Sequence, residues 1–370
     1  MPRLRAVDLR AYPRDQREAA ALRLEEHERY EEFSLATPPL IRFLLIITGD
    51  RERRLVVTSH RLLLDDWSHA ALIRAVLAAF CTGSGTRVAD RSGAARPCSL
   101  AGRSHEVVSA AIRGPDLRSE TYTDCEFDLA AASGAQSPVR LSRAVPAEVI
   151  RRIHGCAVEQ GFDPQSVVHG AWAFALAGLT GRSQVAFTTA VADSRTGSAG
   201  DPGPIDVARA FLPLTVPVRA ARSSIDLVRV VSRRSADLAA QLSGGAIDQL
   251  EYSADQFEYS APRVPFENVA DTVAVLEPEP IGPITPRLGI RINTLSTNEA
   301  KPFPLSFSVV PGPAWIARLD YQAAVLPPRV AESVLTGAMA FLEMTAYAPH
   351  RPLERIDGWS AAQVRSVRAA

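Results

Sequence analysis

The stretch 55–80 constrains the fold most, because a buried strand, a polar loop and an amphipathic helix follow one another there without spacers. Residues 55–58 are apolar or β-branched and predict the strand. Ser68 is a suitable helix N-cap. After it, apolar residues recur at spacings of three and four, which predicts a helix with one buried face: Leu72, Ile73, Val76, Leu77 and Phe80. Polar groups between two buried elements need partners, so we expect any chemistry in the loop 60–68.

This loop carries a motif. It reads His60, Arg61, Leu62, Leu63, Leu64, Asp65, Asp66, Trp67 and Ser68. The order resembles the signature of the condensation-domain superfamily of nonribosomal peptide synthetases, in which His-His, three residues and Asp-Gly usually precede Trp-Ser. Arg61 stands in the place of the second His, and Asp66 in the place of the Gly. The resemblance implies an α/β fold of two chloramphenicol-acetyltransferase-like lobes. Each lobe would be a mixed sheet with helices on its outer face, and the two would form a V with the loop at their junction.

The HRxxxDD form of the motif is similar to that of the X domain of glycopeptide-antibiotic synthetases. An X domain has no condensation activity and recruits haem-thiolate cytochrome oxygenases to a carrier-bound peptide, whose aromatic side chains become cross-linked. The resemblance therefore implies a non-catalytic recruitment domain without a cofactor of its own. Its expected partners are such an oxygenase and an adjacent peptidyl carrier domain.

Arg61 and Asp66 separate the functional alternatives. In active family members the second His assists the attacking amine, and a general base needs a pKa near the working pH. Arginine stays protonated in proteins, so Arg61 cannot accept the proton. Asp66 supplies an anion that can pair with Arg61, and its side chain narrows the passage that a glycine leaves open. These residues favour recruitment, or a folded but idle relic, over an active condensation or epimerisation (acyl-transfer) domain with an altered site.

The other motif residues have structural interpretations, and we predict no catalytic residue. A histidine that follows a strand, as His60 does, is more often a satisfied core residue than a catalyst. The resemblance makes Asp65 a structural aspartate that pairs with an arginine. Because an unpaired buried carboxylate is costly, we expect some arginine of this chain to serve. Trp67 is expected to anchor the core, and no histidine elsewhere has metal-ligand spacing.

The first half of the chain contains a predicted hairpin. The apolar run 40–48 predicts a central strand, Gly49 and Asp50 a turn, and residues 53–58 the returning strand. A charged helix is predicted before it, at 18–32. The candidates for the inner face of this helix include Ala19, Leu22, His27 and Tyr30.

A change of lobe is predicted near Arg118, after a loop at 81–102 and a helix at 104–113. The N-terminal lobe then comprises residues 1–118, and the resemblance implies that it lacks the family's first segment. The C-terminal lobe comprises residues 119–370. In this lobe the patterns predict strands at 139–145, 184–191, 211–218, 271–276, 303–310 and 314–321, and helices at 146–160, 164–179, 225–242 and 330–347.

Charge and cysteine content exclude several classes of function. Lys+Arg and Asp+Glu number 41 each, so the net charge is zero and indicates neither a nucleic-acid nor a membrane partner. No apolar run approaches the roughly 18 residues of a membrane span. The cysteines, Cys81, Cys98, Cys125 and Cys156, have no paired spacing, which fits a reduced, cytoplasmic compartment. Lys301 is the one lysine, so arginine supplies the positive charge; this fits a GC-rich coding origin and suits bidentate ion pairs at an interface.

Overall fold

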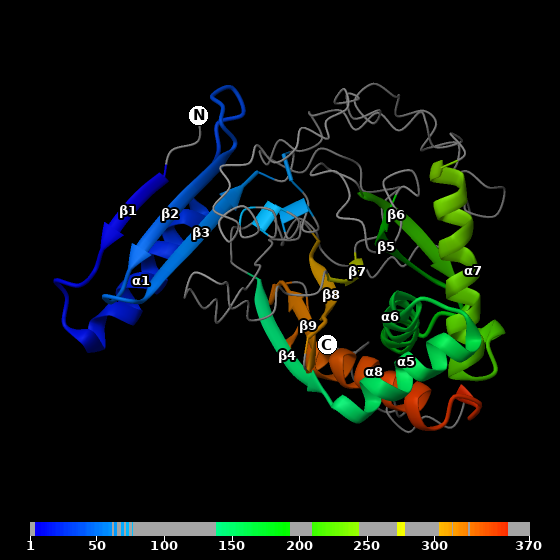
Figure 1. Ribbon diagram of the computed structural model, residues 1–370. Coiled ribbons are helices and arrows are strands. Elements are labelled where there is room, and N and C mark those ends of the chain that lie inside the picture. Colours follow the sequence, from blue (N-terminus) through cyan, green and yellow to red (C-terminus); the bar gives the residue numbers. More distant parts are fainter. Residues whose placement is uncertain are drawn as a thin grey trace. The chain divides into compact units, whose positions relative to one another are not determined.

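The computed structural model describes residues 4–60, 138–192, 209–243, 272–277 and 303–353, the last without 313 and 325, and a few residues between 63 and 76. The chain divides into two compact units (Figure 1). The first contains Met1–Leu72, and the second contains most of the remaining residues. The predicted boundary near Arg118, the loop at 81–102 and the helix at 104–113 lie outside the described residues.

The first unit is a three-stranded sheet with one helix on it. Its strands are β1 (Leu4–Asp8), β2 (Ile41–Ile47) and β3 (Arg53–Ser59), in the order β1-β2-β3, and its helix is α1 (Arg14–Tyr30). Strand β2 pairs in parallel with β1 and antiparallel with β3. The predicted hairpin, with β2 at the centre, is therefore confirmed. Strand β1 was not predicted, because its five residues contain two charged side chains and give no clear alternation.

Three of the four candidates for the inner face of α1 are wrong, and the side chain of the fourth, Tyr30, lies outside the described residues. Leu22 is 51% exposed, and Ala19 and His27 are also exposed. Ala21 is instead fully buried against Leu44 and Ile46 of β2, with Leu24 partly buried beside it. Glu28 continues the same buried stripe, at 3% exposure, because two arginines pair with its carboxylate. Because a charged residue lies on this inner face, the helical period of α1 cannot be recognised by counting apolar side chains alone.

The second unit is a six-stranded mixed sheet with the strand order β4-β9-β8-β7-β5-β6. Its strands are β4 (Val139–Val145), β5 (Val185–Ala192), β6 (Arg209–Val216), β7 (Thr272–Leu276), β8 (Leu305–Val310) and β9 (Trp315–Tyr321). Its helices are α5 (Ala147–Gln160), α6 (Pro164–Thr180), the short η2 (Val218–Ala220), α7 (Ser224–Ser243) and α8 (Pro328–Tyr347). Strands β5, β7 and β8 run parallel to one another, and the other pairings are antiparallel.

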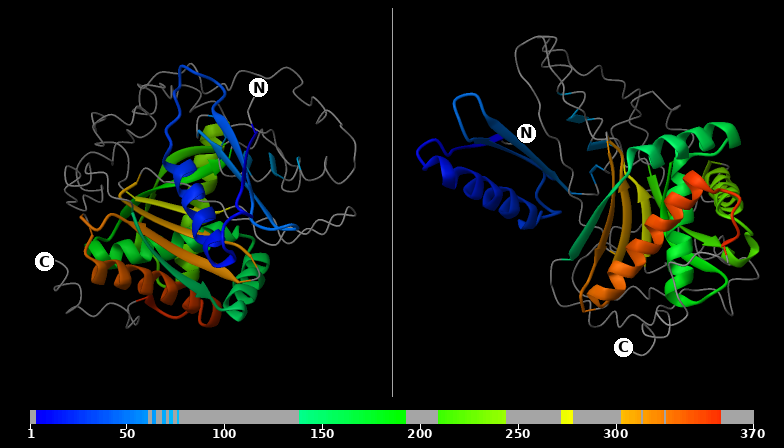
Figure 2. Two further views of the ribbon diagram at one scale, coloured as in Figure 1. Left: turned by 90° about the vertical axis from the view of Figure 1, so that its left-hand side faces the viewer. Right: turned by 90° about the horizontal axis from the view of Figure 1, so that it is seen from below.

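The helices of the second unit pack on one face of this sheet (Figure 2). Helix α6 lies at the centre, with Trp172 stacked on Phe307 of β8 at a ring-centroid distance of 5.2 Å. Gly170 lets α8 approach closely, because a Cβ there would lie 3.1 Å from the ring of Phe341. Gly161 and Gly181 end α5 and α6 in the left-handed conformation, each at φ 70°. The predicted elements of this unit are confirmed within about two residues.

The α/β architecture with mixed sheets is thus confirmed, and each unit carries helices on one face of its sheet. The arrangement of the lobes as a V stays a prediction. Within the described ranges, none of the helices combines the length and apolarity that a bilayer crossing requires.

Candidate functional site

The motif loop starts where β3 ends. The backbone N–H of His60 donates to the carbonyl of Leu40 at 2.9 Å, so the hairpin ladder extends one residue past Ser59. The chain then turns, because the N–H groups of Leu63 and Leu64 both donate to the carbonyl of His60, at 2.9 and 3.4 Å. Leu64 points into the protein and is 8% exposed. The first motif residue is therefore held by its backbone on both sides.

A hydrogen bond closes the base of the loop. Ser59 Oγ, the last side chain of β3, lies 2.6 Å from Nε2 of His69, which is helical. Ser68, just before His69, is 3% exposed. Ser59 and His69, which flank the motif, are thus in contact, and this hydrogen bond sets the distance between the two ends of the loop. His69 has no metal-ligand spacing in the sequence, and its place directly after the motif is the signal that could have marked this contact.

The ring of His60 packs against the C-terminal end of α1. It meets Phe33 edge to face, with ring centroids 6.2 Å apart and planes at 87°. The guanidinium of Arg42 lies over the same Phe33 ring, 4.1 Å from its centroid. His60 is half-buried in this position, as expected for a structural histidine. The structural role of His60 stays a prediction.

Arg42 also binds the last carbonyls of α1. Its Nη2 donates to the carbonyls of Glu28 and Glu31, at 3.0 and 2.7 Å, and Nη1 donates to that of Glu32 at 3.4 Å. A cation is favourable at a helix C-terminus, where unsatisfied carbonyls gather. Nε lies 3.3 Å from the buried carboxylate of Glu28, which also pairs with Arg5 at 3.4 Å. One arginine therefore ties β2, α1 and the Phe33–His60 contact together.

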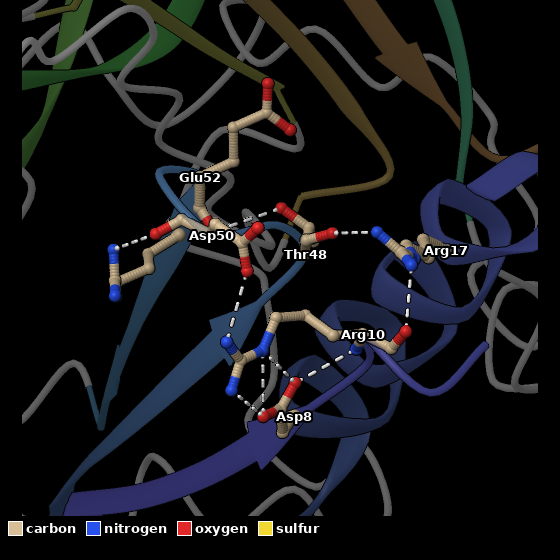
Figure 3. A network of polar contacts seen from close by, with 7 residues as sticks. Asp8, Arg10, Arg17, Thr48, Asp50 and Glu52 are labelled. Atoms are coloured by element: carbon tan, nitrogen blue, oxygen red, sulfur yellow. Dashed lines mark hydrogen bonds and ion pairs between the residues drawn. The ribbon is translucent and has the colours of Figure 1, made fainter. Parts of the chain in front are cut away.

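A second network holds the opposite end of the hairpin (Figure 3). Arg10 binds both oxygens of Asp8, at 3.0 and 2.7 Å, and Asp50 in the turn at 3.2 Å. Hydrogen bonds from Arg10 lower the pKa of Asp8 to about 2. Arg17 donates to three backbone carbonyls: those of Tyr12, Thr48 and Arg10. These contacts fix the frame from which β3 leads into the motif.

The structure does not describe the altered motif positions. Arg61, Asp65, Asp66 and Trp67 lie outside the described residues. The Arg61–Asp66 pairing, the arginine partner of Asp65 and the core role of Trp67 therefore stay predictions. What is described is the frame around them, which comes from Ser59, His60 and His69.

A polar cluster lies inside the second unit. His169 of α6 is 1% exposed, and its Nε2 lies 2.7 Å from Thr189 Oγ1 and 3.4 Å from Gln165 Nε2. Its Nδ1 has no partner that satisfies hydrogen-bond geometry, although the backbone of Ala274 lies near enough to favour the proton slightly. Burial lowers the pKa of His169 to about 4, so the ring is neutral at pH 7. The cluster joins α6 to β5 and is structural in character.

The described residues hold no other constellation for chemistry. Among them, no three His, Cys, Asp or Glu side chains come together in a way that could hold a metal ion. Cys156 is a half-buried free thiol, and burial raises its pKa. The other three cysteines lie outside the described residues.

Sequence comparison places the chain beside peptide synthetases. No family model matches. The chain is 27% identical over 214 residues to vanchrobactin synthetase VabF of Vibrio anguillarum, which is 55% of this chain and 7% of that protein. It is 29% identical over 197 residues to phosphinothricin tripeptide synthetase PhsB of Streptomyces viridochromogenes, which is 50% of this chain and 16% of that protein. The chain therefore spans a small part of the length of these relatives.

Solved structures share the fold over nearly the whole chain. The epimerization domain from the third module of tyrocidine synthetase B matches with a TM-score of 0.68 at 13% identity, covering 94% of this chain and 80% of that one. The first condensation domain of the calcium-dependent antibiotic synthetase matches with a TM-score of 0.59 at 17% identity, covering 95% and 80%. The chain has the fold of a condensation domain. A four-domain nonribosomal peptide synthetase also matches, with a TM-score of 0.64 at 15% identity over 97% of this chain and 28% of that one.

The chain thus has the condensation-domain fold and is similar in sequence to parts of peptide synthetases. The fold expected from the HRxxxDD motif is confirmed. The condensation fold is common to acyl-transfer and epimerisation enzymes, so it does not by itself decide between a catalytic and a non-catalytic domain.

Proposed function

We propose that this condensation-like domain forms no amide bond and instead recruits a haem-thiolate cytochrome oxygenase to a carrier-bound peptide. The observation that carries the proposal is Arg61, which stands where active family members have their second His. A guanidinium cannot take a proton from an attacking amine, because it is already protonated at any working pH. The base of the general acid–base step is therefore missing.

The frame around the motif supports a domain that kept its fold while it lost its base. Ser59 and His69 still close the base of the loop, and Phe33 still packs on His60. Recruitment uses the folded domain as a docking partner beside the carrier, so it needs no base. Tethering to the carrier raises the effective concentration of the oxygenase, and a modest intrinsic affinity is then sufficient.

A second candidate is an active condensation or epimerisation domain with an altered site. It is favoured by the similar structures, which include an epimerization domain and a condensation domain. In that case a group other than Arg61 would have to move the proton. An idle relic is the third possibility, and it differs from recruitment in having no oxygenase partner.

A carrier assay separates catalysis from its absence. The domain is mixed with donor-loaded and acceptor-loaded carrier proteins, with an active condensation domain as the positive control. We expect no dipeptide above background. Arg61→His alone should also give none, because Asp66 would still stand where active family members have the glycine that leaves a passage open. Turnover by the wild-type domain comparable to that of the control would refute the proposal, and recovery in Arg61→His would show that Arg61 was the only lesion.

A titration tests the partner. Calorimetry with a cytochrome oxygenase from the same biosynthetic cluster, at two salt concentrations, should show a complex that weakens as salt rises. Arg61→Ala should leave the complex intact, because the motif loop has no part in it. No complex at either salt concentration, with both proteins folded, would favour the idle relic.

A further inference from the structure

A serine and a histidine flank the motif loop in the geometry of a nucleophile and its base. Ser59 Oγ lies 2.6 Å from Nε2 of His69, at the short end of the range that such pairs occupy. In the tautomer that carries its proton on Nδ1, Nε2 accepts the hydrogen bond from the hydroxyl. The same lone pair takes the proton when a serine oxygen attacks an acyl carbon. We call these two side chains the Ser59–His69 pair.

The Ser59–His69 pair is partly exposed, whereas a similar pair in the second unit is not. Ser59 and His69 are each half-buried. Thr189 Oγ1 lies 2.7 Å from Nε2 of His169, but both residues are 1% exposed and lie between α6 and β5. Catalysis requires that a substrate reach the oxygen and the nitrogen together. The pair beside the motif is therefore the candidate for chemistry, and the buried pair is structural.

Strand alternation places Ser59 on the side of the first sheet opposite α1. Arg54 pairs with carboxylates of α1, and Val56 packs against the small core beneath that helix. Successive side chains of a strand point to opposite faces, and β3 keeps regular pairing with β2 up to Ser59. Ser59 therefore shares its face with Leu55, which is 49% exposed. Because His69 contacts the same hydroxyl, the base lies on this side as well.

The backbone holds the serine in position. Ser59 pairs with Ile41 in the ladder of β2 and β3, and the next residue, His60, donates to the carbonyl of Leu40 at 2.9 Å. The turn that follows is closed by two N–H groups that donate to the carbonyl of His60. The hydroxyl thus lies at the end of a strand, before a turn and a helix that carries the imidazole. Such preorganisation is what an acyl-transfer site requires.

We propose that the Ser59–His69 pair is a nucleophilic acyl site that hydrolyses acyl thioesters. Ser59 Oγ attacks the carbonyl carbon and forms a C–O bond while its proton passes to Nε2 of His69. The C–S bond then breaks, and the leaving sulfur takes that proton, which leaves an acyl ester on Ser59. Water attacks the ester and gives a proton to Nε2, and Ser59 Oγ departs with that proton. The products are a carboxylic acid and a thiol.

This activity is separate from the amide formation that Arg61 excludes. The attacking group is a hydroxyl beside His69, so neither an amine nor a base at position 61 takes part. The choice of a thioester rests on the proposed function, in which the domain lies beside a carrier-bound peptide. Hydrolysis at this place releases an acyl chain from its carrier without extending it.

Two probes test the Ser59–His69 pair on the whole domain. A fluorophosphonate reacts with serines that a base activates, forming a P–O bond as fluoride leaves, and peptide mass spectrometry then identifies the labelled residue. An acyl-pantetheine thioester serves next as substrate, with release of the free acid followed by chromatography. Both measurements use the purified domain alone, so neither depends on an oxygenase.

The variants separate a catalytic pair from a structural hydrogen bond. Ser59→Ala removes the nucleophile. His69→Gln removes the base, but its side-chain carbonyl can still accept the hydrogen bond of the hydroxyl, so the contact across the loop is kept. Ser34→Ala and His27→Gln are the matched controls, because both residues are exposed and belong to the same unit. Circular dichroism and urea denaturation check that each variant folds.

We expect the fluorophosphonate on Ser59 in the wild type and in both controls. Ser59→Ala should remove the label, and His69→Gln should slow labelling and thioester hydrolysis by roughly 10²–10⁴-fold, the usual contribution of a general base.

Three results would overturn the pair as an acyl site: no label on the folded wild-type domain, a label on a different residue, or an unchanged rate in His69→Gln. Labelling of Ser59 without thioester hydrolysis would overturn the substrate class. Absence of an oxygenase complex in the titration above would refute recruitment and leave the pair standing as an acyl site.

Discussion

The two units differ in the interactions that stabilise each of them internally. In the second unit, four helices and the sheet bury one continuous apolar cluster. In the first unit, the described apolar core consists of Leu9, Ala21, Leu44 and Ile46. The first unit adds polar ties from two arginines: Arg42 and Arg17 donate to backbone carbonyls of a helix, a turn and a loop.

This difference has a consequence for dynamics. A large apolar cluster opens cooperatively, because its side chains bury one another. Exposed and half-buried polar contacts can open one at a time. We therefore expect the first unit, which carries the motif loop, to open locally at lower free energy than the second. Three predictions test this contrast.

The largest effect is expected from Phe341→Ala in the second unit. Phe341 is fully buried on α8, packs against Gly170 and lies 5.6 Å from the ring of Phe174. Its truncation leaves a cavity between two helices and should lower the free energy of unfolding by about 3–5 kcal/mol. Tyr347→Ala, on the same helix but 54% exposed, is the control and should cost less than about 1 kcal/mol. Equal costs in urea denaturation would show that burial does not dominate this unit.

The next effect is a pH dependence that arises from His169. Its pKa falls from 6.5 to about 4 on folding, because burial penalises the charged ring. The unfolded chain therefore binds the proton more readily than the folded chain between these values. The free energy of unfolding should fall as the pH drops through that window, by roughly 3 kcal/mol in total, and should be unaffected by this residue above it.

The comparison that isolates His169 uses His169→Gln. The groups described around the ring, Gln165, Thr189 and Phe187, carry no charge, so the titration belongs to His169 itself. The variant should lose stability at pH 7 but show a flatter profile between pH 4 and 6.5 than the wild type. Parallel urea-denaturation profiles for the two proteins would contradict the prediction.

The sequence was most informative where burial decides the structure. Trp172 and its neighbours on α6, and the alternating strand β9, follow simple apolar periods, so their bounds could be predicted closely. Glu28 shows where the method fails. A buried carboxylate breaks the apolar period, and only the folded structure reveals the arginines from β1 and β2 that satisfy it.

The candidate site divides in the same way. Its motif could be predicted from residues 60–68, and the argument against a general base follows from the presence of Arg61. The contacts that frame it, Ser59 to His69 and Phe33 to His60, join residues whose types are ordinary and whose proximity depends on the tertiary fold. No period or spacing marks such pairs in advance.

The smallest of the three effects concerns Arg42, on which the contrast between the units depends most directly. Arg42→Ala removes the donor to the carbonyls of Glu28, Glu31 and Glu32 and leaves the buried Glu28 with Arg5 alone. We expect a loss of about 2 kcal/mol, seen as faster hydrogen exchange of the α1 amides, while exchange in α6 stays unchanged.

Two variants sharpen the prediction for Arg42. Arg42→Lys keeps the charge and a cation over Phe33, but a single ammonium cannot reach the three carbonyls, so it should recover less than half of the loss. Arg54→Ala is the matched control, because Arg54 pairs with Glu18 and Glu25 of the same helix through side chains alone. Such half-exposed pairs contribute little, so its cost should stay below about 1 kcal/mol. If Arg54→Ala exposed the α1 amides as much as Arg42→Ala does, ion pairing in general, rather than the capping of carbonyls by Arg42, would be what holds the first unit together.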